Sequence, residues 1–377
     1  MTATDRTDAP PRDAIPFSLE RLGVVMSPLA GEPTEVCGVL NPATAHRGGE
    51  VFLFPRLVAE GNYSRIGRAR VVFNTAGTPV EVERLGLVLE PEGAWELHVG
   101  GGGVEDPRIT YLPRLRRWIM TYTAFGPLGP RIGLAASADL ERWERLGPVS
   151  FAYDPALATD LNLYPNKDAF LFPEPVTDPG GNPAYAMVHR PMWDLALARP
   201  GEGEPLPAGL IDPRPGIWAS FVGAPGVEAD LGALTRLDQH RLVALPEQPW
   251  EALKIGGGAP PVRVPEGWLL LYHGVSGKLT RGLELQPEVR YSAGVLILDP
   301  DDITRVVARS VDPLLEPERA EEVTGIVPNV VFPTAIEPAR GDGSEYDVYY
   351  GMADARIGAA RLRRTAPPRD RHAPTAS

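Results

Sequence analysis

The chain has 377 residues, of which 43% are hydrophobic and 23% are charged. This apolar content is that of a globular protein, and the 42 prolines and 40 glycines favour short strands over long helices. The net charge is -12 at neutral pH. An acidic surface disfavours nucleic acid and anionic membranes as partners, so we expect neither, while a homo-oligomer stays open.

Cys37 is the single cysteine, so an intrachain disulfide is excluded. The residues that follow Met1 lack the apolar core of a signal peptide, and no stretch is long and apolar enough to cross a membrane. The six histidines form no close ligand pair, and we find no cofactor motif. We therefore predict a cytoplasmic protein without a metal site or a bound cofactor.

Both ends of the chain have the composition of flexible tails. Residues 1–15 mix aspartate, arginine, threonine and proline, and residues 364–377 are similarly polar and proline-rich. Residues 16–363 show no obvious break between them, so we predict one domain there.

A pair of strands recurs five times along this domain. In each pair, a strand of alternating aromatic or apolar residues precedes a strand rich in small residues. The first strands begin at residues 51, 118, 185, 268 and 346, and the second strands cover 64–69, 131–137, 217–220, 291–296 and 356–361. Such a repeat is long enough for a four-stranded blade with its loops. The sequence therefore predicts an all-β, five-bladed β-propeller; a two-sheet sandwich is the rival, but it explains no recurring motif.

The segment 198–216 interrupts the third repeat. It is rich in proline and glycine and has no periodicity, so it is typical of an extended loop. Two interpretations stay open for it, a lid over an active site and a solvated insertion without a function.

A glycine run at residues 100–103 leads into Glu105, Asp106, Pro107 and Arg108. Pro107 biases Asp106 toward an extended conformation, and the glycines let a ligand or a second backbone approach closely. Asp106 is therefore our candidate catalytic carboxylate, with an Asx-turn at a strand entrance as the alternative. We expect Arg108 to orient this loop, or Glu105 through a bidentate pair. The run lacks the residues and the helix of a nucleotide-binding loop.

Seven stretches of the chain, in order, resemble the motifs of glycoside hydrolase family 130. They are residues 103–109, 166–174, 188–191, 254–258, 271–275, 327–333 and 349–354, so the resemblance covers roughly residues 35 to 362. It implies a five-bladed propeller that acts on β-linked mannosides, such as mannosyl-glucose, mannosyl-N-acetylglucosamine or manno-oligosaccharides. Most characterised members of that family are phosphorylases, which use inorganic phosphate as a co-substrate and release α-mannose 1-phosphate with inversion, and a minority are hydrolases.

The resemblance also implies roles for single residues. Asp106 resembles the general acid of the family, and Lys167, Arg190, Lys254 and His273 resemble its phosphate-binding set. A phosphorylase needs cations to hold its anionic nucleophile, whereas a hydrolase needs a carboxylate base for water. We therefore expect these four side chains to converge on the face opposite Asp106.

Further residues resemble the contacts of the family to the sugar. For the mannosyl unit these are Asn41, Ser64, Arg65 and Asp354, and looser candidates for the acceptor side are Tyr122, Phe125, Tyr164 and Trp193. Some family members carry arginine and asparagine where this chain has Lys167 and Asp168. Asp168 could hold Lys167 in place or contact sugar hydroxyls.

Two alternatives to a phosphorylase stay open. A hydrolase would need a second carboxylate roughly 6.5–9.5 Å from Asp106, and Glu321 and Glu322 are available by residue type. A non-catalytic carbohydrate-binding propeller would not need Asp106 for any turnover.

Overall fold

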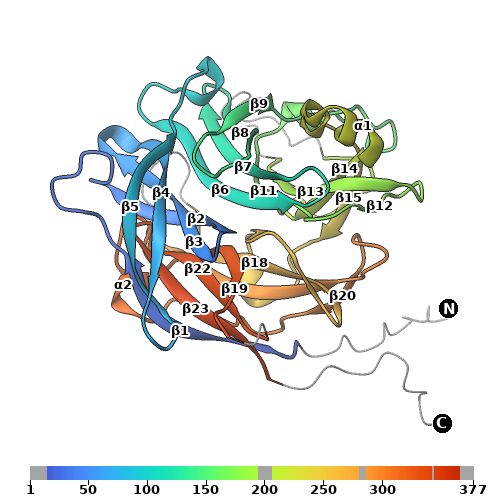
Figure 1. The fold of residues 1–377 in the computed structure, drawn as a ribbon. Helices are drawn as coiled ribbons and strands as arrows, with labels where there is room; N and C mark the ends of the chain where they lie inside the picture. Colours follow the sequence, from blue (N-terminus) through green and yellow to red (C-terminus); the bar gives the residue numbers. More distant parts are fainter. Residues whose placement is uncertain (1–14, 194–205, 280–285, 342–343, 366–377) are drawn as a thin grey trace, which may run out of the picture.

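The computed structural model of the protein describes residues 15–193, 206–279, 286–341 and 344–365 (Figure 1). The predicted tails therefore lie almost entirely outside the described residues, and so does the first part of the 198–216 loop. Nearly all regular structure in the described ranges is β-strand, with two short α-helices, α1 (Ala224–Ala229) and α2 (Ala320–Val323). The prediction of an all-β fold is confirmed. None of the helices in these ranges is long and apolar enough for a membrane crossing.

The strands form four sheets. One sheet contains β1 (Phe17–Met26), β21 (Val331–Pro338), β22 (Tyr346–Met352) and β23 (Arg356–Arg364). The largest contains β2 (Gly38–Arg47), β3 (Glu50–Ala59), β4 (Tyr63–Phe73), β5 (Pro79–Leu89), β6 (Gly102–Leu112), β7 (Arg117–Gly126), β8 (Gly129–Ser137) and β9 (Glu144–Pro148). A third contains β10 (Ser150–Phe151), β11 (Asn166–Leu171), β12 (Val176–Thr177), β13 (Pro183–Pro191), β14 (Ile217–Gly223) and β15 (Arg236–Ala244). The fourth contains β16 (Lys254–Gly257), β17 (Val262–Val264), β18 (Gly267–Gly277), β19 (Val289–Leu298) and β20 (Val306–Arg309). Short 3-10 helices are η1 (Glu60–Asn62), η2 (Ala94–Glu96), η3 (Leu161–Leu163), η4 (Leu231–Thr235) and η5 (Pro249–Glu251).

The five predicted strand pairs are all present as antiparallel neighbours. They are β3 with β4, β7 with β8, β13 with β14, β18 with β19, and β22 with β23. Most of these strands are buried along nearly their whole length, because neighbouring sheets cover both of their faces. The outer strand β5 instead has an exposed side.

The sheets follow one another around a common centre (Figure 1). The eight-stranded sheet consists of two antiparallel groups, β2–β5 and β6–β9, which a short parallel pairing of Tyr63 and Ser64 with Gly102 and Gly103 joins. The first and last strands, β1 and β23, pair antiparallel, so both ends of the described chain lie in one sheet. This pairing closes the ring, with β1 as the edge strand of the sheet.

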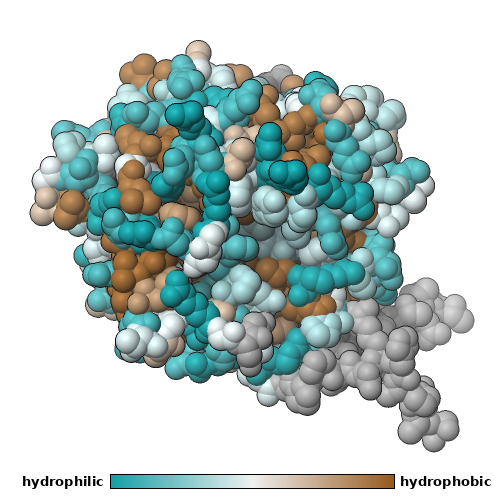
Figure 2. Space-filling view, in the orientation of Figure 1, coloured by the Kyte–Doolittle hydropathy of each residue, from teal (hydrophilic) through white to brown (hydrophobic). Residues whose placement is uncertain are grey.

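Apolar clusters fill the wedges between neighbouring sheets. In one of them, Leu134 of β8 packs with Met187 and Trp218 of the next sheet, and another joins Phe221 of β14 to Tyr272 of β18. The face seen in Figure 2 is mostly hydrophilic, with hydrophobic residues in separate groups. The hydrophobic core of the protein lies between the sheets. The inner strands therefore do not need apolar side chains at the centre and can place polar ones there.

Away from the centre, buried glutamates tie strands of one sheet to the short helical turn that precedes that sheet or group of strands. Glu251 in η5 accepts hydrogen bonds from the Tyr272 hydroxyl at 2.5 Å, from Arg309 at 2.5 Å, and from the backbone N–H groups of Glu247 and Gln248. The same arrangement recurs at Glu96 with Tyr122 and Arg145, and at Glu322 with Tyr350 and Arg21. We call these three sets the Glu–Tyr–Arg networks. They give each buried carboxylate a full set of partners, as burial of a charge requires.

Candidate active site

The inner strands of the ring are irregular where they carry polar residues. Asn41, Asp106 and Asp168 have φ angles of 44°, 45° and 56°, and a register shift accompanies each of them in β2, β6 and β11. Asp354 follows β22 with a φ of 51°. Left-handed backbone costs a non-glycine residue roughly 1–2 kcal/mol, and a β-bulge re-aims the side chain that it carries. These four polar residues of the centre are therefore held in a strained backbone conformation.

Asp106 lies inside β6 and not in a loop before a strand. Its positive φ also contradicts the extended conformation that we expected from Pro107, because the bulge opposite β7 decides the local backbone. The expected close approach of a second backbone is confirmed, since a Cβ at Gly103 would lie 3.1 Å from the Ser64 nitrogen.

Three side chains from three different strands contact the Asp106 carboxylate. Asn41 donates a hydrogen bond at 2.9 Å, Arg56 donates one at 3.1 Å, and the Lys167 Nζ lies 3.4 Å away. Burial alone would raise the pKa of Asp106, but the charges of Lys167, Arg56 and Arg108 outweigh it and hold this pKa well below its usual range. Asp106 is therefore ionised in the free site.

Arg56 links Asp106 to a second buried acid. It pairs with Glu105 at 2.8 Å and donates to the Ser64 hydroxyl at 2.9 Å. Burial nevertheless raises the pKa of Glu105, and it raises the pKa of the nearby Asp354 to about 6. Arg56 thus holds Asp106 in place, and two acids that hold protons more readily belong to the same cluster.

The predicted pair between Arg108 and Glu105 is wrong. Arg108 donates to the backbone carbonyl of Asp106 at 2.6 Å and to that of Gly258 at 2.7 Å, because Arg56 already occupies Glu105. Arg108 does orient the Asp106 backbone, as expected, and it connects β6 to the end of β16.

A second group of charged residues surrounds Asp168 beside this acid. Asp168 Oδ2 lies 2.8 Å from Arg190 Nη2 and 3.6 Å from His273 Nε2. The Lys254 Nζ lies 5.6 Å from the Tyr291 ring centre, and Tyr291 stacks on His273. The predicted phosphate set thus gathers around a carboxylate, which supplies the counter-charge in the free protein.

One expectation about this set needs correction. Lys167 does not lie apart from Asp106, because its ammonium contacts the Asp106 carboxylate. His273 is a neutral imidazole in the free protein, since burial lowers its pKa well below the usual value in spite of Asp168. Burial, with Arg190 and Lys167, also lowers the pKa of Lys254 to about 7.

The centre contains buried polar atoms that have no hydrogen-bond partner. Within the described residues these include both Asp168 oxygens, Arg190 Nε and Nη1, His273 Nδ1, Arg108 Nη2 and Asn41 Oδ1. Leaving a buried charged group unsatisfied is costly, so such a concentration indicates a missing ligand. No group of three side chains in the described ranges could hold a metal ion.

Other predicted sugar-binding residues have partners outside the cluster around Asp106. Arg65 pairs with Glu90 at 3.0 Å, and this partner is half-exposed. Tyr122 belongs to a Glu–Tyr–Arg network, and Tyr164 and Trp193 pack against each other in an apolar cluster, so these aromatics are core residues.

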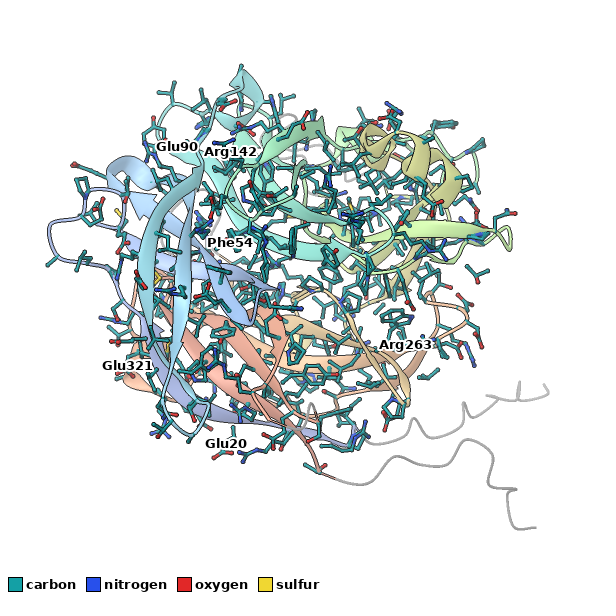
Figure 3. The ribbon with its side chains drawn as sticks, viewed as in Figure 1. Glu20, Phe54, Glu90, Arg142, Arg263 and Glu321 are labelled. Atoms are coloured by element: carbon teal, nitrogen blue, oxygen red, sulfur yellow. The ribbon has the colours of Figure 1, made fainter. Side chains whose placement is uncertain are left out.

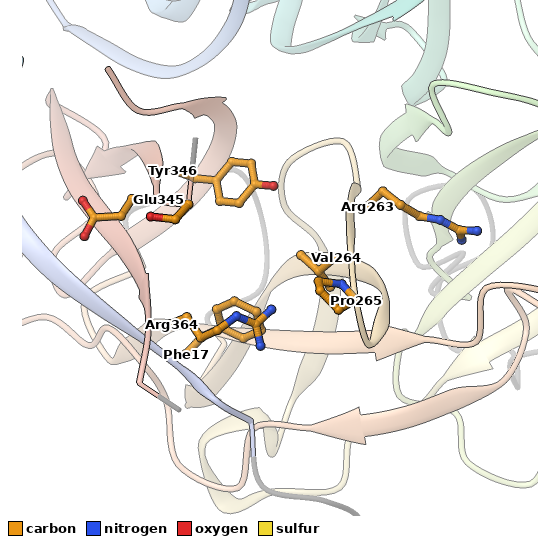
Figure 4. A pocket seen from close by; sticks show the side chains of 8 residues that line it. Phe17, Arg263, Val264, Pro265, Glu345, Tyr346 and Arg364 are labelled. Carbon is orange, nitrogen blue, oxygen red and sulfur yellow. The ribbon is translucent and has the colours of Figure 1, made fainter. Parts of the chain in front are cut away.

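A separate surface pocket of about 280 Å³ lies between β1, β17, β22 and β23 (Figure 4). Its lining consists of Phe17, Arg263, Val264, Pro265, Ser344, Glu345, Tyr346 and Arg364. Arg364 lies over the Phe17 ring and pairs with Glu266, so its charge already has a partner. This pocket shares no residue with the centre.

Sequence reasoning missed Arg56 and Tyr291 as members of the centre. Arg56 belongs to a buried strand, where an arginine needs an acidic partner, and this is a usable signal. Its partner Asp106 lies 50 residues away, so the sequence could not supply the pairing.

Comparisons with known proteins agree with this arrangement. A sequence model of a family described as beta-1,4-mannooligosaccharide phosphorylase matches residues 19–198 and 235–365. The chain is 31% identical to a 1,2-beta-oligomannan phosphorylase of Thermoanaerobacter sp. strain X514, over 90% of this chain and 94% of that protein. It is also 31% identical to a beta-1,2-mannobiose phosphorylase of the same strain, over 91% and 97% of the two chains.

Among solved structures, the beta-1,2-mannobiose phosphorylase of Listeria innocua in complex with beta-1,2-mannobiose is similar, with a TM-score of 0.64. The match has 22% identity and covers 92% of this chain and 96% of that one, and it shows a shared fold. The resemblance inferred from seven short motifs is confirmed by the family match over most of the chain. The protein belongs to glycoside hydrolase family 130.

Proposed function

We propose that the protein is an inverting β-mannoside phosphorylase, which transfers the mannosyl group to inorganic phosphate and releases α-mannose 1-phosphate. The observation that carries the proposal is the cluster of buried Arg190 with the partly buried Lys167 and Lys254 beside Asp106, in which Arg190 Nε and Nη1 lack partners. A site of this kind suits a tetrahedral anion, because arginine offers a planar fork and lysine a point charge. The family relationship and the phosphorylase relatives support it.

Asp106 acts in this proposal as the general acid for the leaving oxygen. An acid needs a proton, yet the surrounding cations keep Asp106 ionised in the free site. Bound phosphate adds negative charge beside Lys167 and so offsets the attraction that lowers the pKa of Asp106. Phosphate binding and protonation of the acid are thereby coupled, and the coupling passes through the 3.4 Å contact between Lys167 and Asp106.

The mannosyl unit binds next to Asp106 in this proposal. Asn41 and Ser64 already belong to its hydrogen-bond network, and the charge of Asp354 acts on the same cluster. Arg56 is a positioning residue, since it holds Asp106 from the side of Ser64. Arg65 remains a prediction for the sugar site, because its present partner is Glu90.

The hydrolase alternative has less support. Glu322 is committed to Arg21 and Tyr350 in a Glu–Tyr–Arg network. Glu321 lies at the outer edge of the molecule (Figure 3). Neither is therefore suited to activate water opposite Asp106, and the cations around Asp168 suit an anionic nucleophile better.

For the fold, we infer that each antiparallel group of strands is one blade, so that the ring has five. The two groups of the eight-stranded sheet count separately because only two residue pairs join them. We further propose that residues 16–363 form one catalytic domain, with tails on both sides.

A product assay tests the function. Purified protein is incubated with β-1,2-mannobiose, the linkage named for both 31% identical relatives, and separately with β-1,4-mannobiose, with and without inorganic phosphate. We expect mannose 1-phosphate that appears only with phosphate. Equal cleavage without phosphate, with free mannose as the only sugar product, would establish the hydrolase instead.

A further inference from the structure

Asp168 is an unusual neighbour for an anion site. Its side chain is only 1% exposed, and neither carboxylate oxygen has a hydrogen-bond partner. Arg190 and His273 flank one of these oxygens at 2.8 and 3.6 Å, in geometries that form no hydrogen bond. The carboxylate therefore retains its capacity to accept hydrogen bonds.

The backbone holds Asp168 in this place. The residue has a φ of 56° at the β11 bulge, which turns its side chain out of the regular strand pattern. On β16, a Cβ at Gly256 would collide with the Asp168 carboxylate and with the His273 ring. Only glycine there leaves room for both side chains, so the carboxylate is built into the site.

An ionised carboxylate can only accept hydrogen bonds. The cations Lys167, Arg190 and Lys254 can donate to the oxygens of a bound anion. A fully deprotonated oxyanion such as sulfate has no O–H group that could donate a hydrogen bond to Asp168. Its negatively charged oxygens would face the carboxylate with no hydrogen atom between them. Hydrogen phosphate still carries one O–H group at neutral pH, and arsenate has the same chemistry.

We propose that Asp168 accepts a hydrogen bond from the P–OH group of hydrogen phosphate and so makes the site select protonated tetrahedral anions over sulfate. The inference rests on the proposed function, because it requires phosphate to bind between Asp168 and the surrounding cations. The cations whose charge acts on Asp168 include Arg190, Lys167 and Arg108. They keep the pKa of Asp168 below its usual value although burial would raise it, so the carboxylate is an acceptor at neutral pH.

The first test uses the unmodified protein. Calorimetric titrations with phosphate, arsenate and sulfate are compared at neutral pH and constant ionic strength. Phosphate and arsenate should bind with affinities within a few-fold of each other, and sulfate should bind about 10- to 100-fold more weakly, as expected when a buried charged acceptor loses its donor. Sulfate that binds as tightly as phosphate would overturn the inference.

The second test removes the acceptor. Asp168→Asn introduces an amide that can donate to any oxyanion, so the preference for phosphate over sulfate should fall to within a few-fold. Asp347→Asn is the matched control, because Asp347 is equally buried but pairs with Arg361 at 2.7 Å, away from the centre. That control should keep the preference of the unmodified protein. Asp168→Ser provides a second variant if the asparagine variant does not fold.

The outcomes separate this inference from the proposed function. If phosphorolysis occurs but Asp168→Asn keeps the anion preference, the inference is wrong and the phosphorylase stands. The same holds if the variant raises only the KM for the mannoside, which would assign Asp168 to the sugar. If the unmodified protein neither binds phosphate nor uses it, the proposed function and the inference fail together.

Discussion

The Glu–Tyr–Arg networks and the centre of the ring bury carboxylates to the same extent but treat them differently. Glu251 is 0% exposed and Asp168 is 1% exposed. Glu251 accepts hydrogen bonds from a tyrosine, an arginine and two backbone N–H groups. The Asp168 carboxylate has an ion pair with Arg190 at 2.8 Å but accepts no hydrogen bond from the described residues. Burial alone therefore does not distinguish a structural acid from a functional one, and the state of its partners does.

The backbone shows the same contrast. The peripheral glutamates Glu96 and Glu251 stand at the third position of single helical turns, from which they reach back to the free backbone N–H groups at the start of the turn. The central acids Asp106 and Asp168 stand at bulges with positive φ. At these two acids the surrounding structure holds a strained backbone conformation, which is consistent with a functional position.

The largest effect is expected at Asp106. Asp106→Asn removes the proposed proton donor while it keeps the size of the side chain, so kcat should fall by roughly 10²- to 10⁴-fold. A substrate with a good leaving group should lose less, because it needs less protonation. Near-normal cleavage of an unactivated mannoside by this variant would refute the role of Asp106.

A peripheral substitution should act on stability and not on chemistry. Glu251→Gln leaves Arg309 without its closest carboxylate in the core, so the free energy of unfolding should fall by about 3–5 kcal/mol in denaturant titrations. The kcat and KM values should stay unchanged at a temperature where the variant is folded. Glu96→Gln is the matched variant in another sheet. A loss of activity without a loss of stability in either variant would contradict a purely structural role of the Glu–Tyr–Arg networks.

Arg190→Ala should affect phosphate more than sugar. It leaves Asp168 without its nearest cation and removes donors from the anion site, so the KM for phosphate should rise by roughly 30- to 1000-fold. The KM for the mannoside should change far less. If both constants rise equally, Arg190 serves the whole site and not the anion.

The smallest effect is a pH dependence from Lys254. Burial together with Arg190 and Lys167 lowers its pKa to about 7, so the ammonium is charged below that pH and neutral above it. Affinity for phosphate should therefore fall as the pH rises through 7, by at most about tenfold per unit. Lys254→Met lacks this contribution at every pH. The phosphate KM of the native protein should therefore approach that of the variant as the pH rises, and the ratio of the variant KM to the native KM should shrink. A ratio that is constant between pH 6 and 9 would contradict this assignment.

The strand pairs of the fold could be predicted from the sequence, because buried strands repeat their aromatic and apolar alternation. The inner strands β2, β6 and β11 could not, since bulges interrupt their pattern and polar residues replace apolar ones. One further repeat was available: residues 91–96 and 246–251 share a Pro-Glu-x-x-Trp-Glu pattern that ends on the buried glutamates of two networks. This repeated pattern indicates that Glu96 and Glu251 have the same structural role.

The candidate site was predictable only where family motifs covered it. The motifs contain Asp106, Lys167 and Arg190, but no local pattern shows that Lys167 contacts the acid or that Arg56 reaches it from another strand. These contacts depend on the closure of the ring, which brings distant segments to one centre. The neutral state of His273 likewise follows from burial that only the folded protein has.

A crystal structure of the protein with inorganic phosphate would test the central claim most directly. The account predicts one phosphate at the centre, within hydrogen-bond distance of the Arg190 and Lys254 nitrogens that lie nearest Asp168, while the Glu–Tyr–Arg networks stay unchanged. A centre that stays free of phosphate at concentrations that support turnover, or phosphate bound only at the outer surface, would contradict it.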